Sequence, residues 1–427
     1  MPQVPSGESG FVRSWRPFQN AFGLAIDAIR AHKLRSFLTL LGVIIGVASV
    51  IMVGAAISGL GVYAEQSTAK AFGSESFLVA QIASVGRLSR REFFDKLKRN
   101  KPIYNGDMRY LESVTGDRVM FSPYRTHISD VKRENQTCED SAVVGVSADM
   151  ASIRDIEVVD GRFFTAQEDR SRAYVAVIGD TIRNTLFPPD TSPVGKTIHV
   201  ENIEFTVVGV QERMGSSFGR DADNLMYIPA TAFARMWGPG TGMALFARAR
   251  PGLGMTMDDA LDDTRVALRT HFHARPGQAD NFDTLTPDAV RGFIDQLLGI
   301  LAVVVMPVTC ISLLVGGIVI MNIMLVSVTE RTHEIGIRKS LGARHHDVMM
   351  QVLIEAVVMA AMGGALGVGV GALATMLLSR VFELTLHITG GYVMLAIGVS
   401  TVVGVASGWY PAARAAKLDP VAALRAE

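Results

Sequence analysis

Residues 36–64 read SFLTLLGVIIGVASVIMVGAAISGLGVYA, a stretch that includes no Asp, Glu, Lys or Arg. Three later stretches, 296–329, 356–379 and 384–413, also lack these four residue types. About 20 apolar residues in a helix cross a bilayer core, and one charge at its centre costs roughly 2.5–3.5 kcal/mol on insertion scales. Each stretch is long enough to span once, so we predict an α-helical membrane protein with four transmembrane helices.

The segment between the first two spans, 65–295, has the composition of a soluble domain. Apolar runs at 142–146 and 174–178 are typical of strands, and residues 196–210 alternate around a turn at Glu201-Asn202. Residues 257–272 have helical spacing. This mixture predicts a large extracytoplasmic α+β domain of two lobes. The zero net charge of the chain gives no indication of a nucleic-acid partner.

Lys and Arg lie before the first span, after the second and after the fourth, whereas the loop between the third and fourth spans has only Arg380. Short loops rich in Lys and Arg stay in the cytoplasm, so both termini are predicted inside. The predicted segments are a cytoplasmic N-terminus with an amphipathic interfacial helix (1–35), span 1 (36–64), the outer domain (65–295), span 2 (296–329), a cytoplasmic loop (330–355), span 3 (356–379), a short outer loop (380–391), span 4 (392–411) and a cytoplasmic tail (412–427).

Small residues recur at four-residue spacing in two of the spans. Gly42 and Gly46 form one such pair, and Gly363, Gly367 and Gly371 repeat the spacing in span 3. Glycine at this spacing lets helix backbones approach closely in a membrane. We predict that these five glycines mediate helix packing. Pro307 in span 2 is expected to kink its helix.

Motifs for catalysis, nucleotide binding or metal binding are not found in the sequence. Gly195-Lys196-Thr197 resembles part of a P-loop, but Asp190 stands where the motif needs glycine and a strand pattern follows. The nine histidines show no HExxH spacing, and the two cysteines lie far apart in the chain. We therefore predict no catalytic, cofactor-binding or metal-binding residues in this chain.

The segment after span 2 mixes apolar residues with charges, in the run ERTHEIGIRKSLGAR at 330–344. A solvated loop does not need Ile-Gly-Ile among charges, so we expect these side chains to bury against a partner, with insertion and folding insensitive to their substitution. Glycine there allows a turn or a close approach. The alternative is a basic loop that only sets topology. The candidate residues are Glu330, Arg331, Glu334, Ile335, Gly336, Ile337, Arg338, Lys339, Leu341, Gly342 and Ala343.

This segment resembles the conserved loop of the FtsX/MacB family of ABC-transporter permeases. The family's first span is similar to residues 34–47, and its sequence after the loop is similar to residues 347–356. Its C-terminal signature is similar to residues 408–425. Three motifs of the outer domain resemble the MacB-type periplasmic domain: Val144-Gly-Val-Ser147, Gly161-Arg-Phe-Phe-Thr165 and Val194-Gly-Lys-Thr197.

The resemblance implies a multi-pass permease subunit of a MacB-like transporter in a bacterial inner membrane. It implies four membrane helices, an outer domain with a porter-like lobe and a second α+β lobe, and a dimer with an identical or paralogous permease. A separate cytoplasmic ABC ATPase would dock on residues 330–343, and its movement would be transmitted to the periplasmic domain for efflux of a substrate. The chain itself would then not be an enzyme.

Two other functions are compatible with the same family. One is a lipoprotein-releasing permease, and the other is an FtsX-like regulator of cell-wall hydrolases that performs no transport. A receptor without an ATPase is disfavoured by the 330–343 segment. The substrate is not readable from the sequence, which also leaves open whether a periplasmic adaptor and an outer-membrane channel take part.

The Lys and Arg asymmetry predicts the labelling pattern of single cysteines placed near residues 10, 150, 340, 386 and 422, after both native cysteines are replaced. A membrane-impermeant thiol reagent added to intact cells should label the cysteines near 150 and 386 only. Labelling near 340 from outside would overturn the predicted topology.

Overall fold

The computed structural model describes residues 33–73, 75–217, 220–238, 240, 242–382 and 386–425. The chain divides into two compact units, Met1–Tyr63 with Gln296–Glu427, and Ala64–Asp295. We call them the helical unit and the α+β unit. The interfacial helix predicted before span 1 lies outside the described residues, except for the last positions of its segment, which begin the first described helix.

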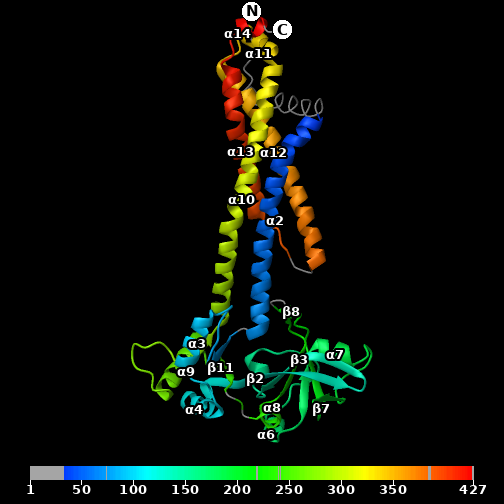
Figure 1. Ribbon diagram of the computed structural model, residues 1–427, viewed down its shortest axis with the longest axis vertical. Coiled ribbons are helices and arrows are strands. Elements are labelled where there is room, and N and C mark those ends of the chain that lie inside the picture. The colour runs from blue at the N-terminus through cyan, green and yellow to red at the C-terminus, as the bar shows by residue number, and fades with distance from the viewer. Residues whose placement is uncertain are drawn as a thin grey trace, which may run out of the picture. The chain divides into compact units, whose positions relative to one another are not determined.

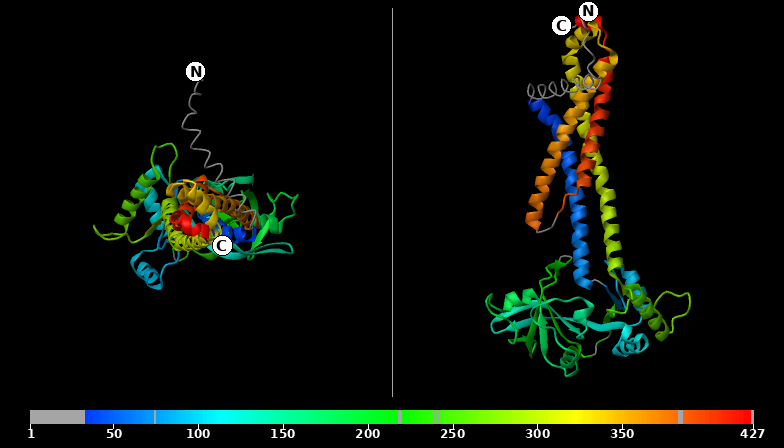
Figure 2. Two further views of the ribbon diagram at one scale, coloured as in Figure 1. Left: turned by 90° about the horizontal axis from the view of Figure 1, so that it is seen from above. Right: turned by 180° about the vertical axis from the view of Figure 1, so that it is seen from behind.

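Four long helices form the helical unit, and all four are apolar and long enough to cross a membrane (Figure 1). Their bounds are α2 Lys33–Phe72, α10 Pro287–Glu330, α12 His345–Phe382 and α13 Gly390–Ala416. Two short helices, α11 Thr332–Ser340 and α14 Pro420–Arg425, lie together at one end of the bundle. The helices α12 and α13 pack against each other, as the right view of Figure 2 shows.

The helices differ from the predicted segments in two places, while α10 runs as one helix through Pro307 and the kink predicted there stays a prediction. First, α2 continues past the uncharged stretch to Phe72, and α10 begins at Pro287, well before its predicted span. Second, the predicted loop 330–355 is mostly helical, because α11 fills its first half and α12 starts at His345. Charged residues end the apolar stretch but do not end a helix, since Glu, Lys and Arg are good helix formers.

Glycines bring the long helices of this unit into close contact. A Cβ built on Gly42 would lie 2.8 Å from Gly316 Cα, so α2 and α10 meet backbone to backbone there. Gly46 faces the Leu313 side chain of α10. On α12, the predicted glycines face α2: Gly363 lies against Val43, Gly367 against Val47 and Gly371 against Ile51. Without water to expel, membrane helices gain their association energy from such close packing.

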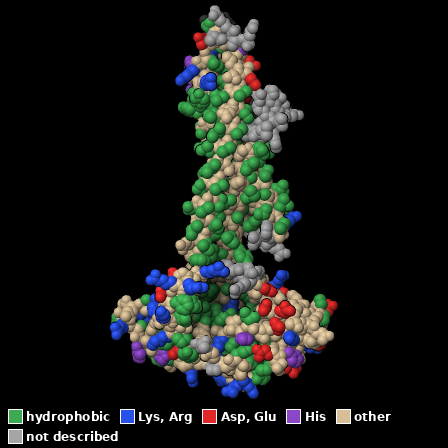
Figure 3. Space-filling model, in the orientation of Figure 1, with side chains coloured by type: hydrophobic (Ala, Val, Ile, Leu, Met, Phe, Trp, Pro, Cys, Tyr) green, Lys and Arg blue, Asp and Glu red, His purple; other side chains and the backbone are tan. Residues whose placement is uncertain are grey.

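The α12–α13 pair is packed by residues that the spacing argument did not single out. A Cβ on Gly404 would lie 2.6 Å from Ala360 Cβ, and one on Gly408 would lie 2.5 Å from Ala356 Cβ. Ser400 Oγ donates a hydrogen bond to the Ala360 carbonyl oxygen at 2.5 Å. The outward faces of the helices are covered by hydrophobic side chains, as a lipid environment requires (Figure 3).

The α+β unit contains twelve strands, counted over its described residues. They are β1 Ser76–Ala80, β2 Val119–Arg133, β3 Gln136–Val146, β4 Val158–Gly161, β5 Val175–Ile178, β6 Thr197–Val200, β7 Ile203–Gln211, β8 Ser216–Ser217, β9 Arg220–Asp221, β10 Leu225–Pro229, β11 Ala244–Ala249 and β12 Asp283–Leu285. Its helices are α3 Arg90–Arg99, α4 Asn105–Thr115, α5 Met150–Ile153, α6 Ala166–Arg170, α7 Asp180–Leu186, α8 Ala230–Trp237 and α9 Met257–His271, with a 3₁₀ turn at Gly116–Arg118.

The long strand β2 belongs to both lobes of this unit. Its first half pairs with β11 in the order β12-β1-β11-β2, and α4 and α9 share the core of that lobe. Its second half pairs with β3 and β6, so that β2-β3-β10-β5-β7-β6 closes into a barrel whose core includes Phe205 and Ile228. The predicted turn at Glu201-Asn202 joins β6 to β7, and Gly195-Lys196-Thr197 leads into strand β6 rather than into a helix.

Gly367→Val should destabilise the helical unit, whereas Gly369→Val should not. A Cβ on Gly367 would lie 2.7 Å from Val47 Cβ and 2.9 Å from the Ile44 carbonyl oxygen, whereas nothing lies within 4 Å of one on Gly369. Overpacking of this kind costs about 1–3 kcal/mol. Thermal unfolding in detergent should therefore show a lower midpoint for Gly367→Val only. Equal midpoints would mean that the α2–α12 contact is absent.

Candidate functional site

The segment that follows α10 forms a helix and a tight turn rather than a loop. After Arg331, α11 runs from Thr332 to Ser340. Gly342 then takes a φ of 98°, in the left-handed region that favours glycine. The Gly342 and Ala343 N–H groups donate to the carbonyl oxygens of Lys339 and Arg338, which satisfies the end of the helix. Gly342 therefore serves the turn into α12.

Ile335 and Gly336 face the interior of the helical unit. Ile335 is 9% exposed and belongs to the same apolar core as residues of α2, α10, α12 and α13. A Cβ on Gly336 would lie 2.7 Å from Ala423 Cβ, which places α11 against α14. Because the chain buries Ile335 itself, this side chain is not available to a partner as the sequence led us to expect, and we now expect its substitution to disturb folding.

Lys339 holds the end of α13. Its Nζ donates to the Ala416 carbonyl oxygen at 2.6 Å and to the Leu418 carbonyl oxygen at 2.7 Å. Ala416 is the last residue of α13 and Leu418 lies between α13 and α14, so both carbonyls are at a helix C-terminus, where a cation is favoured by the helix dipole. Lys339 thus joins α11 to the segment that leads from α13 into α14.

Two arginines join this end of α10 and α11 to α12. Arg331 Nη1 lies 3.3 Å from Glu355 Oε1, and Glu355 is buried. Arg338 Nη1 donates to Gln351 Oε1 at 2.8 Å. These side chains and the exposed Glu334 line a cavity of about 200 Å³. The Glu355 carboxylate is buried while the Arg331 side chain is 37% exposed, so the pair holds the end of α10 to α12 with an attraction that solvent partly screens.

Three apolar residues of α11, of the turn after it and of α14 are exposed: Ile337, Leu341 and Val421. Ile337 is 40% exposed, Leu341 82% and Val421 of α14 61%. We call these three residues the end surface. It is flanked by the exposed side chains of Glu334 and Arg338, while Ala343 packs partly against the core. Such side chains on a rigid, hydrogen-bonded support suit the docking of a partner.

Sequence reasoning did not include α14, Gln351 or Glu355 in the candidate site. A signal for α14 is visible: Asp419-Pro420 places a capping side chain before a proline at the first helical position. Asp419 Oδ1 accepts a hydrogen bond from the Val421 N–H at 2.9 Å. Among the described residues, no group of three or more His, Cys, Asp or Glu side chains could hold a metal ion.

Two family models match the chain. The model of the MacB-like periplasmic core domain matches residues 36–265. The model of the FtsX-like permease C-terminal region matches residues 306–420, which include α11, α12 and α13.

Individual proteins are also similar. The chain is 32% identical over 433 residues to the macrolide export ATP-binding/permease protein MacB 2 of Aeromonas hydrophila. It is 34% identical over 430 residues to the macrolide export ATP-binding/permease protein MacB of Rhodospirillum rubrum. Each match covers 99% of this chain and 63% of the relative, so the chain spans less than two thirds of these proteins. The solved periplasmic region of MacB from Actinobacillus actinomycetemcomitans is 14% identical over 53% of this chain and 95% of that structure, with a TM-score of 0.42.

Lys339→Met should loosen α14, because it removes both hydrogen bonds to the end of α13 while keeping the aliphatic stem. A hydrogen bond to a charged group contributes about 1.5–3 kcal/mol. Amide hydrogen exchange in residues 418–425 should accelerate about tenfold or more. Lys417→Met, which alters an exposed neighbouring lysine, is the matched control and should leave the exchange unchanged. Equal exchange in both variants would contradict the capping role.

Proposed function

Because the chain belongs to the family of FtsX-like membrane permeases with a MacB-like periplasmic core domain, we propose that it is the permease subunit of a MacB-like ABC transporter. The protein is a multi-pass protein of the inner membrane, and its α+β unit is periplasmic. The proposal adds that the end surface receives movement from a cytoplasmic ABC ATPase. The movement then drives efflux of a substrate from the periplasm.

The observation that carries the proposal is the construction of the end surface. Ile337, Leu341 and Val421 are exposed apolar side chains on and beside two short helices. Burying an aliphatic side chain contributes roughly 1.5–3 kcal/mol, so a partner that covers all three gains substantial affinity. The ends of the helices are where a cytoplasmic protein can reach them.

The contacts behind the end surface explain how a push on α11 could reach the long helices. Lys339 binds the end of α13, Gly336 lies against α14, and Arg331 binds Glu355 of α12. Movement of α11 relative to any one of them would break a polar or close-packed contact. In turn, α10 is one helix of 44 residues, about 66 Å long at 1.5 Å per residue. Such a helix can carry displacement along its axis.

We place ATP hydrolysis outside the permease portion that this sequence covers, in a partner subunit or a fused domain. The relatives are named ATP-binding/permease proteins, while the sequence of this chain contains no complete P-loop motif. The relatives' names also specify macrolide export. For this chain we propose only the broader class, export of a substrate from the periplasm, because no cavity lined by the described residues of the α+β unit indicates a narrower one.

A second permease would complete the transporter. Exposed apolar residues lie on several sides of α10, among them Leu297, Ile300, Leu301, Val303, Val304, Val308, Ile311 and Val315. A surface of this extent leaves room for a partner helix beside lipid. The partner that we propose is a second copy or a paralogue of this chain.

Ile337→Asp and Leu341→Asp should weaken ATPase binding without lowering membrane abundance, because both side chains are exposed. The Kd for the ATPase should rise by about tenfold to a hundredfold. Binding is measured between the purified ABC ATPase and the full chain in nanodiscs, where the chain alone should hydrolyse no ATP.

Two further variants serve as controls for this experiment. Ile335→Asp should lower abundance, because it introduces a charge into the core. Ile128→Asp, at an exposed position of β2, should leave both binding and abundance unchanged. Normal ATPase binding by both exposed-site variants would refute the docking role of the end surface.

A further inference from the structure

Arg125 of the α+β unit is a buried cation that forms no ion pair with any described residue. Its side chain is 9% exposed. Nη2 donates to Asn105 Oδ1 at 3.4 Å and lies 3.5 Å from Met243 Sδ, while Nε is buried and has no acceptor in the described part of the chain. Burial lowers the pKa of the guanidinium, because the charge is poorly solvated and no anion offsets the loss. Buried charges in proteins are normally paired, so a counter-ion is expected here.

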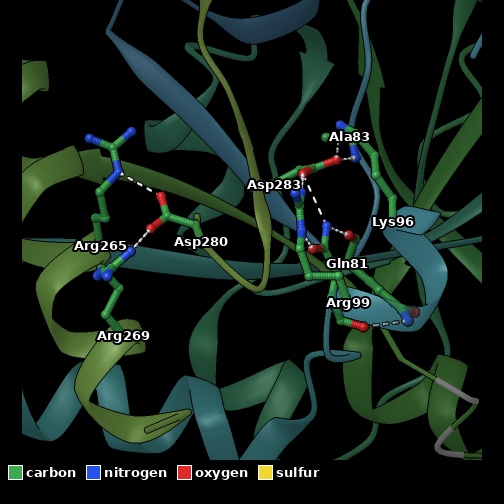
Figure 4. A network of polar contacts seen from close by, with 9 residues as sticks. Gln81, Ala83, Lys96, Arg99, Arg265, Arg269, Asp280 and Asp283 are labelled. Atoms are coloured by element: carbon green, nitrogen blue, oxygen red, sulfur yellow. Dashed lines mark hydrogen bonds and ion pairs between the residues drawn. The ribbon is translucent and has the colours of Figure 1, made fainter. Parts of the chain in front are cut away.

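Other buried charged groups of the same unit have stronger partners. Asp283, which is also 9% exposed, lies 2.6 Å from Lys96 Nζ, and Figure 4 shows further donors around its carboxylate. The buried guanidinium of Arg154 donates to the Tyr227 hydroxyl at 3.0 Å and also to a backbone carbonyl oxygen. Compared with these groups, Arg125 has only two long contacts, both to uncharged atoms.

The first turn of α4 lies beside this guanidinium and is open. Asn105 begins α4, and both it and Gly106 are exposed. Their N–H groups donate to no described residue, as is usual in the first turn of a helix. A Cβ added to Gly106 would meet nothing within 4 Å. The N-terminus of an 11-residue helix attracts anions, so the positive end of α4 and the buried cation meet at Asn105.

The acidic side chain of this turn is occupied elsewhere. Asp107 Oδ2 accepts a hydrogen bond from the Tyr104 N–H at 2.7 Å, and Asp107 Oδ1 lies 2.7 Å from His271 Nε2. Arg109 Nε donates to the Asn105 carbonyl oxygen at 3.4 Å and brings a second cation to the turn. The chain itself therefore does not supply the anion that Arg125 lacks.

We infer that Arg125, Asn105 and the first turn of α4 bind a carboxylate group, and that the exported substrate is a compound that carries one. The identification of the substrate rests on the proposed function, whereas the carboxylate site does not. A carboxylate is planar and fits the fork of a guanidinium, whose single charge it neutralises. The Asn105 amide and the free N–H groups of α4 supply further donors to the same anion.

The site lies where the two lobes of the α+β unit meet. Tyr124 of β2 pairs with Ala244 of β11, and the next residue, Arg125, pairs with Gly145 of β3. Helix α4 belongs to the lobe built around β11. A carboxylate that binds Arg125 and α4 together would link the two lobes, so its binding or release would change how firmly they are joined.

The first test follows the fluorine NMR line of trifluoroacetate added to the full chain in phosphatidylcholine nanodiscs. The line should broaden beyond its width with empty nanodiscs, acetate should reverse the broadening, and neutral trifluoroacetamide should show none. Arg125→Met should abolish the broadening, whereas Arg118→Met, at an exposed arginine that pairs with Asp263, should keep it. No broadening, equal broadening in Arg125→Met, or stronger competition by inorganic phosphate than by acetate would overturn the inference.

Asn105→Asp tests the site without removing the arginine. The new carboxylate has nearly the shape of the amide and lies beside Arg125, so it supplies the counter-ion from the chain. We expect this variant to lose trifluoroacetate binding and to unfold in detergent at a midpoint no lower than that of the parent chain. Arg125→Lys, which keeps the charge but not the planar fork, should bind about tenfold more weakly. Full trifluoroacetate binding by Asn105→Asp would contradict the assignment.

The substrate is tested by mass spectrometry of the culture medium of cells that carry the parent chain, Arg125→Met or Ile337→Asp. Compounds whose release is lost in both variants should contain a carboxyl group. Arg125→Met should keep ATPase binding, which separates this inference from the proposed function. Release that is lost in Ile337→Asp but kept in Arg125→Met would overturn the identification of the substrate, whereas release that neither variant changes would count against the proposed function.

Discussion

The structure of the helical unit depends on close backbone approach between helices that are apolar on all sides. In hydrocarbon, burying one more leucine gains little, so association depends on how closely two helices can pack. The contact of Gly42 with Gly316 and the row Gly363, Gly367 and Gly371 against α2 meet this condition. With α2, α10 and α12 held in this way, α13 completes the unit through Gly404 and Gly408, which lie against α12.

A different kind of contact operates where the helices leave the apolar layer. There Lys339 binds carbonyl oxygens at the end of α13, and Arg331 pairs with the buried Glu355. Polar contacts of this type have direction, so they fix the orientation of α11 as well as its position. The same short helix therefore buries Ile335 inside and presents Ile337 outside. Ile335 thus contributes to the stability of the unit, while Ile337, two residues later, belongs to the surface proposed to dock an ATPase.

The α+β unit uses a related arrangement around Asp283. Its carboxylate holds α3 by the polar side and leaves Phe93, Phe94 and Leu97 exposed. In both units, a short amphipathic helix is fixed by charged or polar groups beside the end of α10, and part of its apolar side chains remains available.

The membrane helices and the two-lobed domain between them were predictable from the sequence, because uncharged stretches long enough to span a bilayer and alternating strands have few other stable arrangements. The sequence also indicated the glycine rows, since four-residue spacing puts them on one side of a helix. The sequence could not decide which apolar residues of 330–343 face inward, because Ile335 and Ile337 have the same chemistry and differ only in what surrounds α11. Only the tertiary structure separated them, through α14 and the ends of α10 and α12, and only it paired Lys339, Glu355 and Asp283 with partners far along the chain. Contacts of that range arise from the path of the whole chain, which no local pattern of residues encodes.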